Sequence, residues 1–201
     1  MCENNEINTL ENIPNNMPKR KSYLGCKVGN FILKIMGWKV LGPLPDYSKL
    51  IVIGAPHTSI WDFFVAVPII MAFDIKATIM MKKEAFFWPM KGLWGSLGFI
   101  PIDRQAPNGV VGSIVEHIEK DSNVWVVLTP EGTRSKAKKW KTGFLNIAKN
   151  ADIPILLLAW DYPTKTIQFG PIFKPTGNNE LDLLEIQKWY KPYRGKKPEN
   201  Q

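Results

Sequence analysis

Apolar and polar positions along this chain of 201 residues change repeatedly between the period of a strand and that of a helix. Short runs rich in Ile, Val, Leu and Phe are typical of buried strands. They cover residues 50–54, 76–81, 99–103, 123–128, 154–160 and 166–170. Helical spacing predicts helices at 60–73, 84–96, 109–120, 141–150 and 180–190. This alternation indicates an α/β domain with a central, mostly parallel or mixed sheet flanked by helices, and with sites at its strand ends.

An amphipathic pattern precedes the first of these strands. Between residues 22 and 38, apolar side chains recur at helical spacing and lysines flank them. The apolar positions are Leu24, Val28, Phe31, Ile32, Ile35 and Met36. The pattern predicts an N-terminal basic amphipathic helix, which could either pack on the core or lie on a membrane surface. The sequence leaves both interpretations open.

Composition changes at each end of the chain and sets the expected domain boundaries. Residues 1–21 begin polar and acidic and contain Pro14 and Pro18, which predicts a disordered tail. Residues 22–190 form the predicted domain. Residues 191–201 are rich in lysine and arginine and predict a basic flexible tail.

Charge and hydropathy restrict the partners and the location. The net charge is +8, and it becomes +11 without residues 1–18, which hold three glutamates and no Lys or Arg. Such a surplus favours contact with phosphates on a membrane, a nucleic acid or a small substrate. The longest charge-free apolar stretch, 63–73, has 11 residues, whereas a helix needs about 20 to cross a bilayer. Two cysteines are too few for a disulfide framework, which favours a reducing compartment.

His57 and Asp62, directly after the strand at 50–54, are the first candidates for chemistry. An imidazole can act as a base near neutral pH, and a carboxylate can fix its tautomer. Five positions on a continuous helix separate two side chains by about 140°, so they can meet only if His57 lies in a loop and Asp62 in the first helical turn. Ser59 and Asp62 fit the pattern of a helix start. The alternative is that Asp62 only caps a helix.

Two further charged segments follow predicted strands. Asp103 and Arg104 end one strand, where they could hold a phosphate or form only a surface ion pair. Pro-Glu-Gly-Thr-Arg at 130–134 follows another strand, with proline and glycine making a turn. This turn could bind a ligand or simply face solvent.

Taken in order, these segments resemble the lysophosphatidic acid / glycerol-3-phosphate acyltransferase superfamily. The matching segments are His-x4-Asp at 57–62, Gly-Phe-Ile-Pro-Ile-Asp-Arg at 98–104, Pro-Glu-Gly-Thr-Arg at 130–134 and Ile-Pro-Ile at 153–155. The resemblance covers about residues 38–173 and is greatest to compact bacterial members. One segment alone would be weak evidence, whereas the ordered set is specific.

The resemblance implies a glycerolphosphate acyltransferase-like fold and a set of site residues. His57 would be the general base and Asp62 its orienting partner. The implied acceptor- and phosphate-binding residues are Arg104, Glu131, Gly132, Thr133 and Arg134, with Lys83 as a weaker candidate. The acyl group would pass from acyl-CoA or acyl-carrier protein to a lysophospholipid-type acceptor, with 1-acylglycerol 3-phosphate expected.

The residues themselves predict transfer without a covalent intermediate. No Gly-x-Ser-x-Gly elbow is present, and both cysteines lie outside the matching segments. Backbone N–H groups at the helix start after Ser59 are the expected donors to the oxyanion. No metal or cofactor is expected, and His117 is assigned a structural role because it lies beside the apolar stripe of its helix.

The remaining expectations concern partners and alternatives. The expected partners are an acyl thioester donor, a lipid acceptor and an anionic membrane surface, with no nucleic acid. The expected location is the cytoplasm, at the inner face of the cell membrane. The aromatic-rich segment 85–99 could line an acyl channel, lie in the lipid interface or pack in the core. Alternatives are an acyltransferase for glycerol 3-phosphate or another lipid precursor, and a non-catalytic basic protein that binds nucleic acid or membranes.

Overall fold

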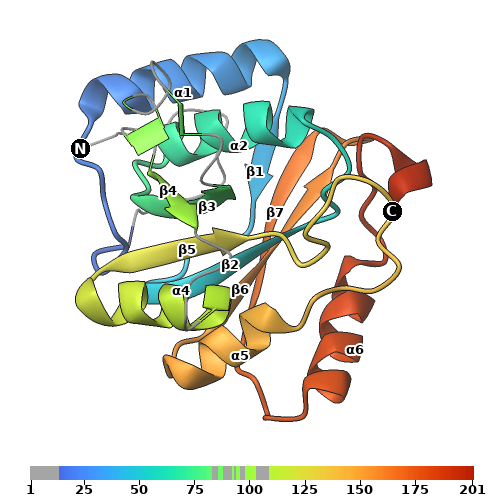
Figure 1. Cartoon of the computed structure of the whole chain (residues 1–201). Helices are drawn as coiled ribbons and strands as arrows, with labels where there is room; N and C mark the ends of the chain where they lie inside the picture. The colour runs from blue at the N-terminus through green and yellow to red at the C-terminus, as the bar shows by residue number, and fades with distance from the viewer. Residues whose placement is uncertain (1–13, 83–85, 88–91, 93, 96–97, 103–108) are drawn as a thin grey trace.

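The computed structural model describes residues 14–82, 86–87, 92, 94–95, 98–102 and 109–201. Its elements form three layers, with a central sheet between two layers of helices (Figure 1). One face is covered by α1 (Tyr23–Met36) and α2 (Trp61–Ala72). The other is covered by α4 (Gly109–Lys120), α5 (Gly143–Asn150) and α6 (Asn179–Tyr190). This arrangement confirms the predicted α/β class.

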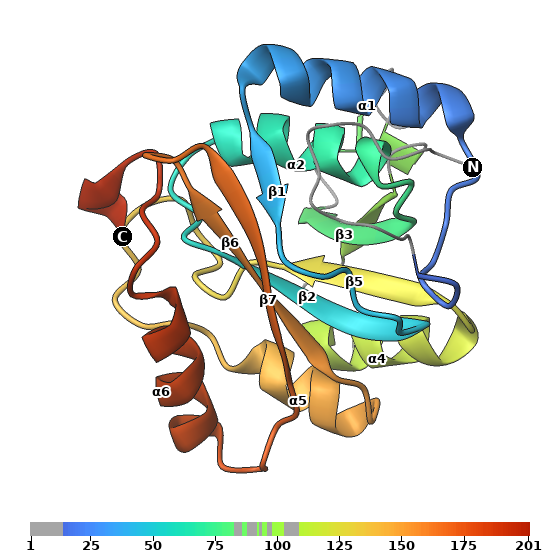
Figure 2. The same ribbon diagram turned by 180° about the vertical axis from the view of Figure 1, so that it is seen from behind.

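Within the described residues the sheet has seven strands in the order β1-β7-β6-β2-β5-β3-β4. Their bounds are β1 (Lys39–Leu41), β2 (Lys49–Ala55), β3 (Ala77–Lys82), β4 (Phe99–Ile102), β5 (Val124–Leu128), β6 (Ile155–Asp161) and β7 (Thr166–Phe173). Neighbouring strands are parallel except β6 and β7, which are antiparallel. The sheet is therefore mixed, and the carboxyl ends of β2, β5 and β6 meet at one edge (Figure 2).

The central strand β2 is apolar throughout because helices cover both of its faces. Leu50 and Val52 belong to the core under α1 and α2, whereas Ile51 and Ile53 belong to the core under α4 and α5. All four side chains are buried. A strand buried on both faces loses the alternation of polar and apolar residues, which is why its sequence is a continuous apolar run.

The predicted elements agree with the observed ones to within a few residues. The exception is β1, whose three residues are too few to give a pattern. The helix predicted at 84–96 lies largely outside the described residues. Among the helices that the structure describes, none is both long and apolar enough to cross a membrane.

Residues 14–21 correct the prediction of a disordered tail that extends to residue 21. Met17 is buried, and Lys19 forms a bridge with Ile75. The Asp74 carboxylate accepts the backbone N–H groups of Lys21 and Ser22, at 3.0 and 2.9 Å. Hydrogen bonds and one buried side chain thus attach this segment to the chain after α2. Residues 1–13 lie outside the described part of the chain.

The C-terminal segment, residues 191–201, also differs from the prediction of a flexible tail. It folds back toward the sheet edge and ends in a short 3₁₀ helix (Pro198–Asn200). The Arg194 carbonyl accepts the backbone N–H of Tyr162 at 2.9 Å, and the Lys197 N–H donates to Thr58 Oγ1 at 3.1 Å. Its basic composition suggested solvation, but its backbone groups are bonded to the loops beside β2 and β6.

Helix α1 leaves much of its apolar surface uncovered. Its buried residues pack toward α2, while Leu24, Phe31 and Ile35 are 73%, 64% and 70% exposed. Cys26 lies on the buried side of the helix.

Candidate active site

The sequence-predicted residues that the structure describes gather where β2 and β5 end. His57 follows β2, and Glu131 follows β5, its parallel neighbour. On the other side of β2, Tyr162 follows β6. Loops after parallel neighbouring strands leave the sheet at the same edge. Side chains far apart in the sequence are thereby brought into one site.

His57 and Asp62 form the pair that the sequence predicted. His57 lies in the loop after β2, and Asp62 is the second residue of α2. The imidazole Nδ1 lies 2.9 Å from Asp62 Oδ2, and the two side chains are 21% and 1% exposed. The aspartate is therefore enclosed, whereas the imidazole has access to solvent and to a substrate. A carboxylate at Nδ1 orients the ring and leaves Nε2 as the basic nitrogen.

Asp62 also takes part in capping its own helix, so the one carboxylate contacts His57 and makes the helix-start contacts that the sequence pattern predicted. Its Oδ2 accepts the backbone N–H groups of Thr58 and Ser59, each at 3.0 Å. In return, Ser59 Oγ accepts the N–H of Trp61 at 3.3 Å. This reciprocal arrangement is a capping box. It restrains Oδ2 of the carboxylate relative to the backbone that carries His57.

The same hydrogen bonds occupy several backbone N–H groups near the expected oxyanion donors. The N–H groups of Thr58 and Ser59 bind Asp62, and those of Trp61 and Asp62 bind Ser59. These four donors at the start of α2 are thus occupied within the chain. The Ile60 N–H is not among these four, so a backbone donor to the oxyanion stays a prediction, and a cation from the segments near the site is the alternative.

Glu131 holds the backbone of the loop that carries His57. Both of its carboxylate oxygens lie 3.0 Å from the backbone nitrogen of His57, which donates to them. The Glu131 side chain is buried. Burial raises its pKa to about 7, against the opposing effect of the His57 N–H. The sequence placed Glu131 among acceptor-binding residues, and the structure adds this contact with the loop of the base.

Gly132, Thr133 and Arg134 form an exposed turn directly after Glu131. Gly132 has a φ of +64°, a conformation that glycine adopts at little cost. A Cβ at this position would lie 2.9 Å from both Cε and Nζ of Lys141. The Lys141 side chain therefore lies against the turn. It was not among the predicted site residues.

The remaining predicted residues cannot be placed in the site. Lys83, Asp103 and Arg104 lie outside the described residues. Of the aromatic segment 85–99, the described rings of Trp94 and Phe99 pack with Phe63 of α2, at centroid distances of 5.9 and 5.6 Å. For these two rings, core packing is the observed role.

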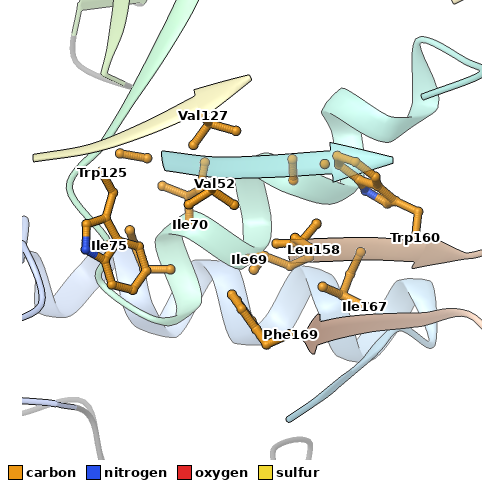
Figure 3. Close-up of a pocket in the computed structure, with 13 residues that line it drawn as sticks. Val52, Ile69, Ile70, Ile75, Trp125, Val127, Leu158, Trp160, Ile167 and Phe169 are labelled. Atoms are coloured by element: carbon orange, nitrogen blue, oxygen red, sulfur yellow. The ribbon is translucent and has the colours of Figure 1, made fainter. Parts of the chain in front are cut away.

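An apolar cavity of about 50 Å³ lies between the sheet and α2 (Figure 3). Its lining is aliphatic and aromatic, and it extends along β2 from Trp125 at one end to Trp160 at the other. The Trp160 ring lies 6.3 Å from the His57 ring, centroid to centroid. One end of an apolar cavity is therefore next to the candidate base. Ala66 of α2 contributes to its wall.

Tyr162 is a site residue that sequence patterns missed. Its hydroxyl donates to Asp62 Oδ1 at 2.6 Å. The residue lies 100 positions after Asp62 and outside the segments that carry the resemblance. Only the pairing of β6 with β2 brings the two together.

Comparisons with known proteins concern the family and the fold of the chain. A family model described as Acyltransferase matches residues 38–159, more than half of the chain. No curated protein sequence matches the chain significantly. Among solved structures, it is similar to the 1-acyl-sn-glycerophosphate (LPA) acyltransferase PlsC from Thermotoga maritima. The two are 19% identical, with a TM-score of 0.62 over 85% of this chain and 78% of that one. At this identity, the likeness concerns the fold.

Proposed function

The chain belongs to the acyltransferase family, and from this premise we propose that it transfers an acyl group to the hydroxyl of a lysophospholipid. The proposed donor is acyl-CoA or acyl-carrier protein, and the proposed acceptor is 1-acylglycerol 3-phosphate. The observation that carries the proposal is the 2.9 Å contact between His57 Nδ1 and Asp62 Oδ2, beside an apolar cavity. A base next to a place for an aliphatic chain suits acyl transfer better than simple binding.

The proposed reaction is direct attack by the acceptor hydroxyl on the thioester. His57 Nε2 takes the hydroxyl proton as the new carbon–oxygen bond forms, and Asp62 stabilises the imidazolium by remaining ionised. The tetrahedral intermediate collapses with cleavage of the carbon–sulfur bond. The leaving thiolate then takes the proton from His57. Each group returns to its starting state, so no covalent enzyme intermediate is needed.

The end of the donor's acyl chain is proposed to enter the cavity along β2, whose volume of about 50 Å³ holds only a few methylene groups. The cavity is lined by apolar groups and ends near His57, which would bring the thioester carbonyl close to the base. Burying methylene groups in such a cavity contributes about 0.8 kcal/mol each. The aliphatic chain therefore provides binding free energy, while the reacting carbonyl stays outside the cavity.

The phosphate of the acceptor is proposed to bind the turn after β5. Arg134 is exposed there, and Lys141 lies against Gly132. Arginine suits this role because its guanidinium can hold two phosphate oxygens at once. Thr133 would add a hydroxyl, and Glu131 would place the turn relative to His57. Lys83 and Arg104 remain proposed members of this group.

The protein is proposed to work on an anionic membrane surface, where lysophospholipids reside. Exposed apolar residues of α1 alternate with basic ones: Leu24, Lys27, Phe31, Lys34 and Ile35. Such a helix can insert its apolar face among lipids while lysines approach the headgroups. Each cation near an anionic surface contributes on the order of 1 kcal/mol.

The test is acyl transfer by the purified protein on anionic vesicles, with labelled acyl-CoA or acyl-carrier protein. The acceptor panel contains 1-acylglycerol 3-phosphate, glycerol 3-phosphate and a lysophospholipid without a free phosphomonoester. His57→Ala should reduce kcat by roughly 10³-fold or more, whereas the control His117→Ala should keep it. Product on one acceptor, lost only with His57→Ala, would establish the reaction. No product from folded protein with any pair would refute it and favour a non-catalytic binding protein.

A further inference from the structure

The Asp62 carboxylate has its two oxygens in different surroundings. Oδ2 contacts the imidazole Nδ1 and accepts two backbone N–H groups. Oδ1 accepts the hydroxyl of Tyr162 at 2.6 Å. Since the carboxylate is 1% exposed, water cannot readily replace that donor. The orientation of the carboxylate therefore depends on a residue from the turn after β6.

Tyr162 is itself fixed from three sides. The edge-to-face contact with Trp38 places their ring centroids 4.9 Å apart. Its backbone N–H donates to the Arg194 carbonyl at 2.9 Å, and the Arg194 N–H donates to Asp161 Oδ1 at 3.1 Å. The tyrosine is thus held by β6, by the residue before β1 and by the C-terminal segment. A fixed donor can set the position of a carboxylate that a mobile one could not.

The Tyr162 hydroxyl can act only as a donor to Asp62. Burial raises the pKa of this tyrosine far above its ordinary value, and the hydrogen bond and the charge of Asp62 raise it further. The phenol therefore keeps its proton across the working range of an enzyme. A neutral phenol hydroxyl donates a hydrogen bond to an ionised carboxylate, which can only accept. Tyr162 is therefore the donor and Asp62 the acceptor.

We propose that Tyr162 is a positioning residue of the catalytic pair: its hydroxyl holds Asp62 Oδ1 so that Oδ2 faces His57 Nδ1. The expected effect on turnover rests on the proposed function. The structural part of the inference is that the Tyr162 hydroxyl determines the contact between Asp62 and His57, and this part does not depend on the substrate. Tyr162 would act through Asp62, which it contacts directly.

The test uses Tyr162→Phe in the full chain, which removes the hydroxyl and keeps the ring against Trp38. Tyr193→Phe is the matched control: it is the same chemical change in the C-terminal segment, and the described contacts of Asp62 do not involve Tyr193. We expect kcat to fall roughly tenfold for Tyr162→Phe, while KM for donor and acceptor changes less than about twofold. The control should keep the wild-type kcat and KM.

A second measurement reads the contact itself. The chain has two histidines, so ¹⁵N-histidine labelling gives two imidazole spin systems, and His117→Ala assigns them. The Nδ1–H resonance of His57, shifted downfield by its carboxylate partner, should move or broaden in Tyr162→Phe and stay in place in Tyr193→Phe. An unchanged resonance in Tyr162→Phe would overturn the proposal, whatever the value of kcat.

The two measurements separate this proposal from the proposed function. If the wild-type protein transfers no acyl group, the reaction is refuted, but the resonance still reports the role of Tyr162. If transfer occurs and the resonance does not change with Tyr162→Phe, the reaction stands and the positioning role is overturned. Thermal unfolding of both variants checks that each is folded before either result is used.

Discussion

The carboxylate of Glu131 receives the backbone N–H of His57 in both of its oxygens, each at 3.0 Å. Strands β2 and β5 are parallel neighbours, and this contact joins the turn after β5 to the loop after β2. Two segments that carry the family resemblance are thereby parts of one structure, in which the glutamate of one holds the backbone of the proposed base in the other. The turn can then place its exposed side chains at a fixed distance from the imidazole.

Glu131 should make the stability of the protein depend on pH. Burial raises its pKa from 4.5 to about 7 in the folded state, so between these values the folded state binds more protons than the unfolded state. Stability attributable to this group is full below about pH 4.5 and is lost as the pH rises through 7. The size of the loss is about 3 kcal/mol at most.

The measurement is the free energy of unfolding in urea at pH 5 and pH 7.5, for wild type and Glu131→Gln. The neutral amide does not titrate, so the free energy of unfolding of Glu131→Gln should rise relative to that of wild type between pH 5 and pH 7.5. A difference between the two proteins that is the same at both pH values would contradict the raised pKa.

Arg134→Ala should weaken acceptor binding if the turn after β5 holds the phosphate. Arg134 is exposed beside Glu131, and losing one charge-assisted contact costs roughly tenfold in affinity. We expect KM for 1-acylglycerol 3-phosphate to rise about tenfold with kcat nearly unchanged. Lys138→Ala, which removes one charge from the same exposed segment, is the control. A monoacylglycerol lacks the phosphate, so its KM should be unaffected; a fall in kcat alone would refute the role.

The fold and the pair His57–Asp62 could be predicted because both depend on local patterns. Apolar runs mark the strands, and a histidine after a strand followed by a helix start leaves few geometries for the pair. Tyr162 could not be predicted, because its contact with Asp62 depends on the order of the strands in the sheet. The C-terminal segment was misjudged for a related reason: its side chains are basic, but its backbone is bonded within the fold.

Ala66→Leu should change which acyl chains are accepted. Ala66 lines the cavity from α2, opposite β2, and leucine adds three carbon atoms to that wall. If the cavity holds the acyl chain, the longest chain used efficiently should shorten by roughly three methylene groups, at about 0.8 kcal/mol each. Rates with saturated acyl-CoA donors of graded length measure this. Ala151→Leu, on the other face of the sheet, is the control, and an unchanged chain-length profile in Ala66→Leu would argue against the cavity.

Membrane binding should depend on the exposed face of α1. The double change Leu24→Glu and Phe31→Glu removes two exposed apolar side chains, 73% and 64% accessible, and should weaken binding to anionic vesicles at least tenfold. The matched control is Leu181→Glu with Leu184→Glu on α6, where two leucines are similarly exposed at 61% and 63%. Both double variants add two negative charges. A difference between them in co-sedimentation with the vesicles therefore reports the position of the changes and not the added charge. Equal losses in the two proteins would contradict docking through α1, which lies on the other side of the sheet from α6 (Figure 1).

Gly195 lies in the C-terminal segment, and Gly195→Ala should disturb the loop that carries His57. A Cβ at Gly195 would lie 2.5 Å from Thr58 Oγ1 and 2.8 Å from its Cγ2, too close for either atom to stay in place. Thr58 also donates its backbone N–H to Asp62, so moving it displaces the carboxylate that orients His57. We expect kcat to fall roughly tenfold with little change in KM, as for other changes that act through a positioning contact.

Combining Gly195→Ala with Thr58→Ala tests whether the effect depends on the contact between the new Cβ and the Thr58 side chain. Alanine removes both atoms that the new Cβ would strike and keeps the backbone N–H that donates to Asp62. The double variant should therefore have nearly the same kcat as Thr58→Ala alone. The coupling between the two changes then about equals the effect of Gly195→Ala in the wild-type protein. Independent effects that simply add would show that the C-terminal segment influences turnover by another route. Because the Lys197 N–H loses its acceptor in Thr58→Ala, that single variant gives the baseline from which the coupling is measured.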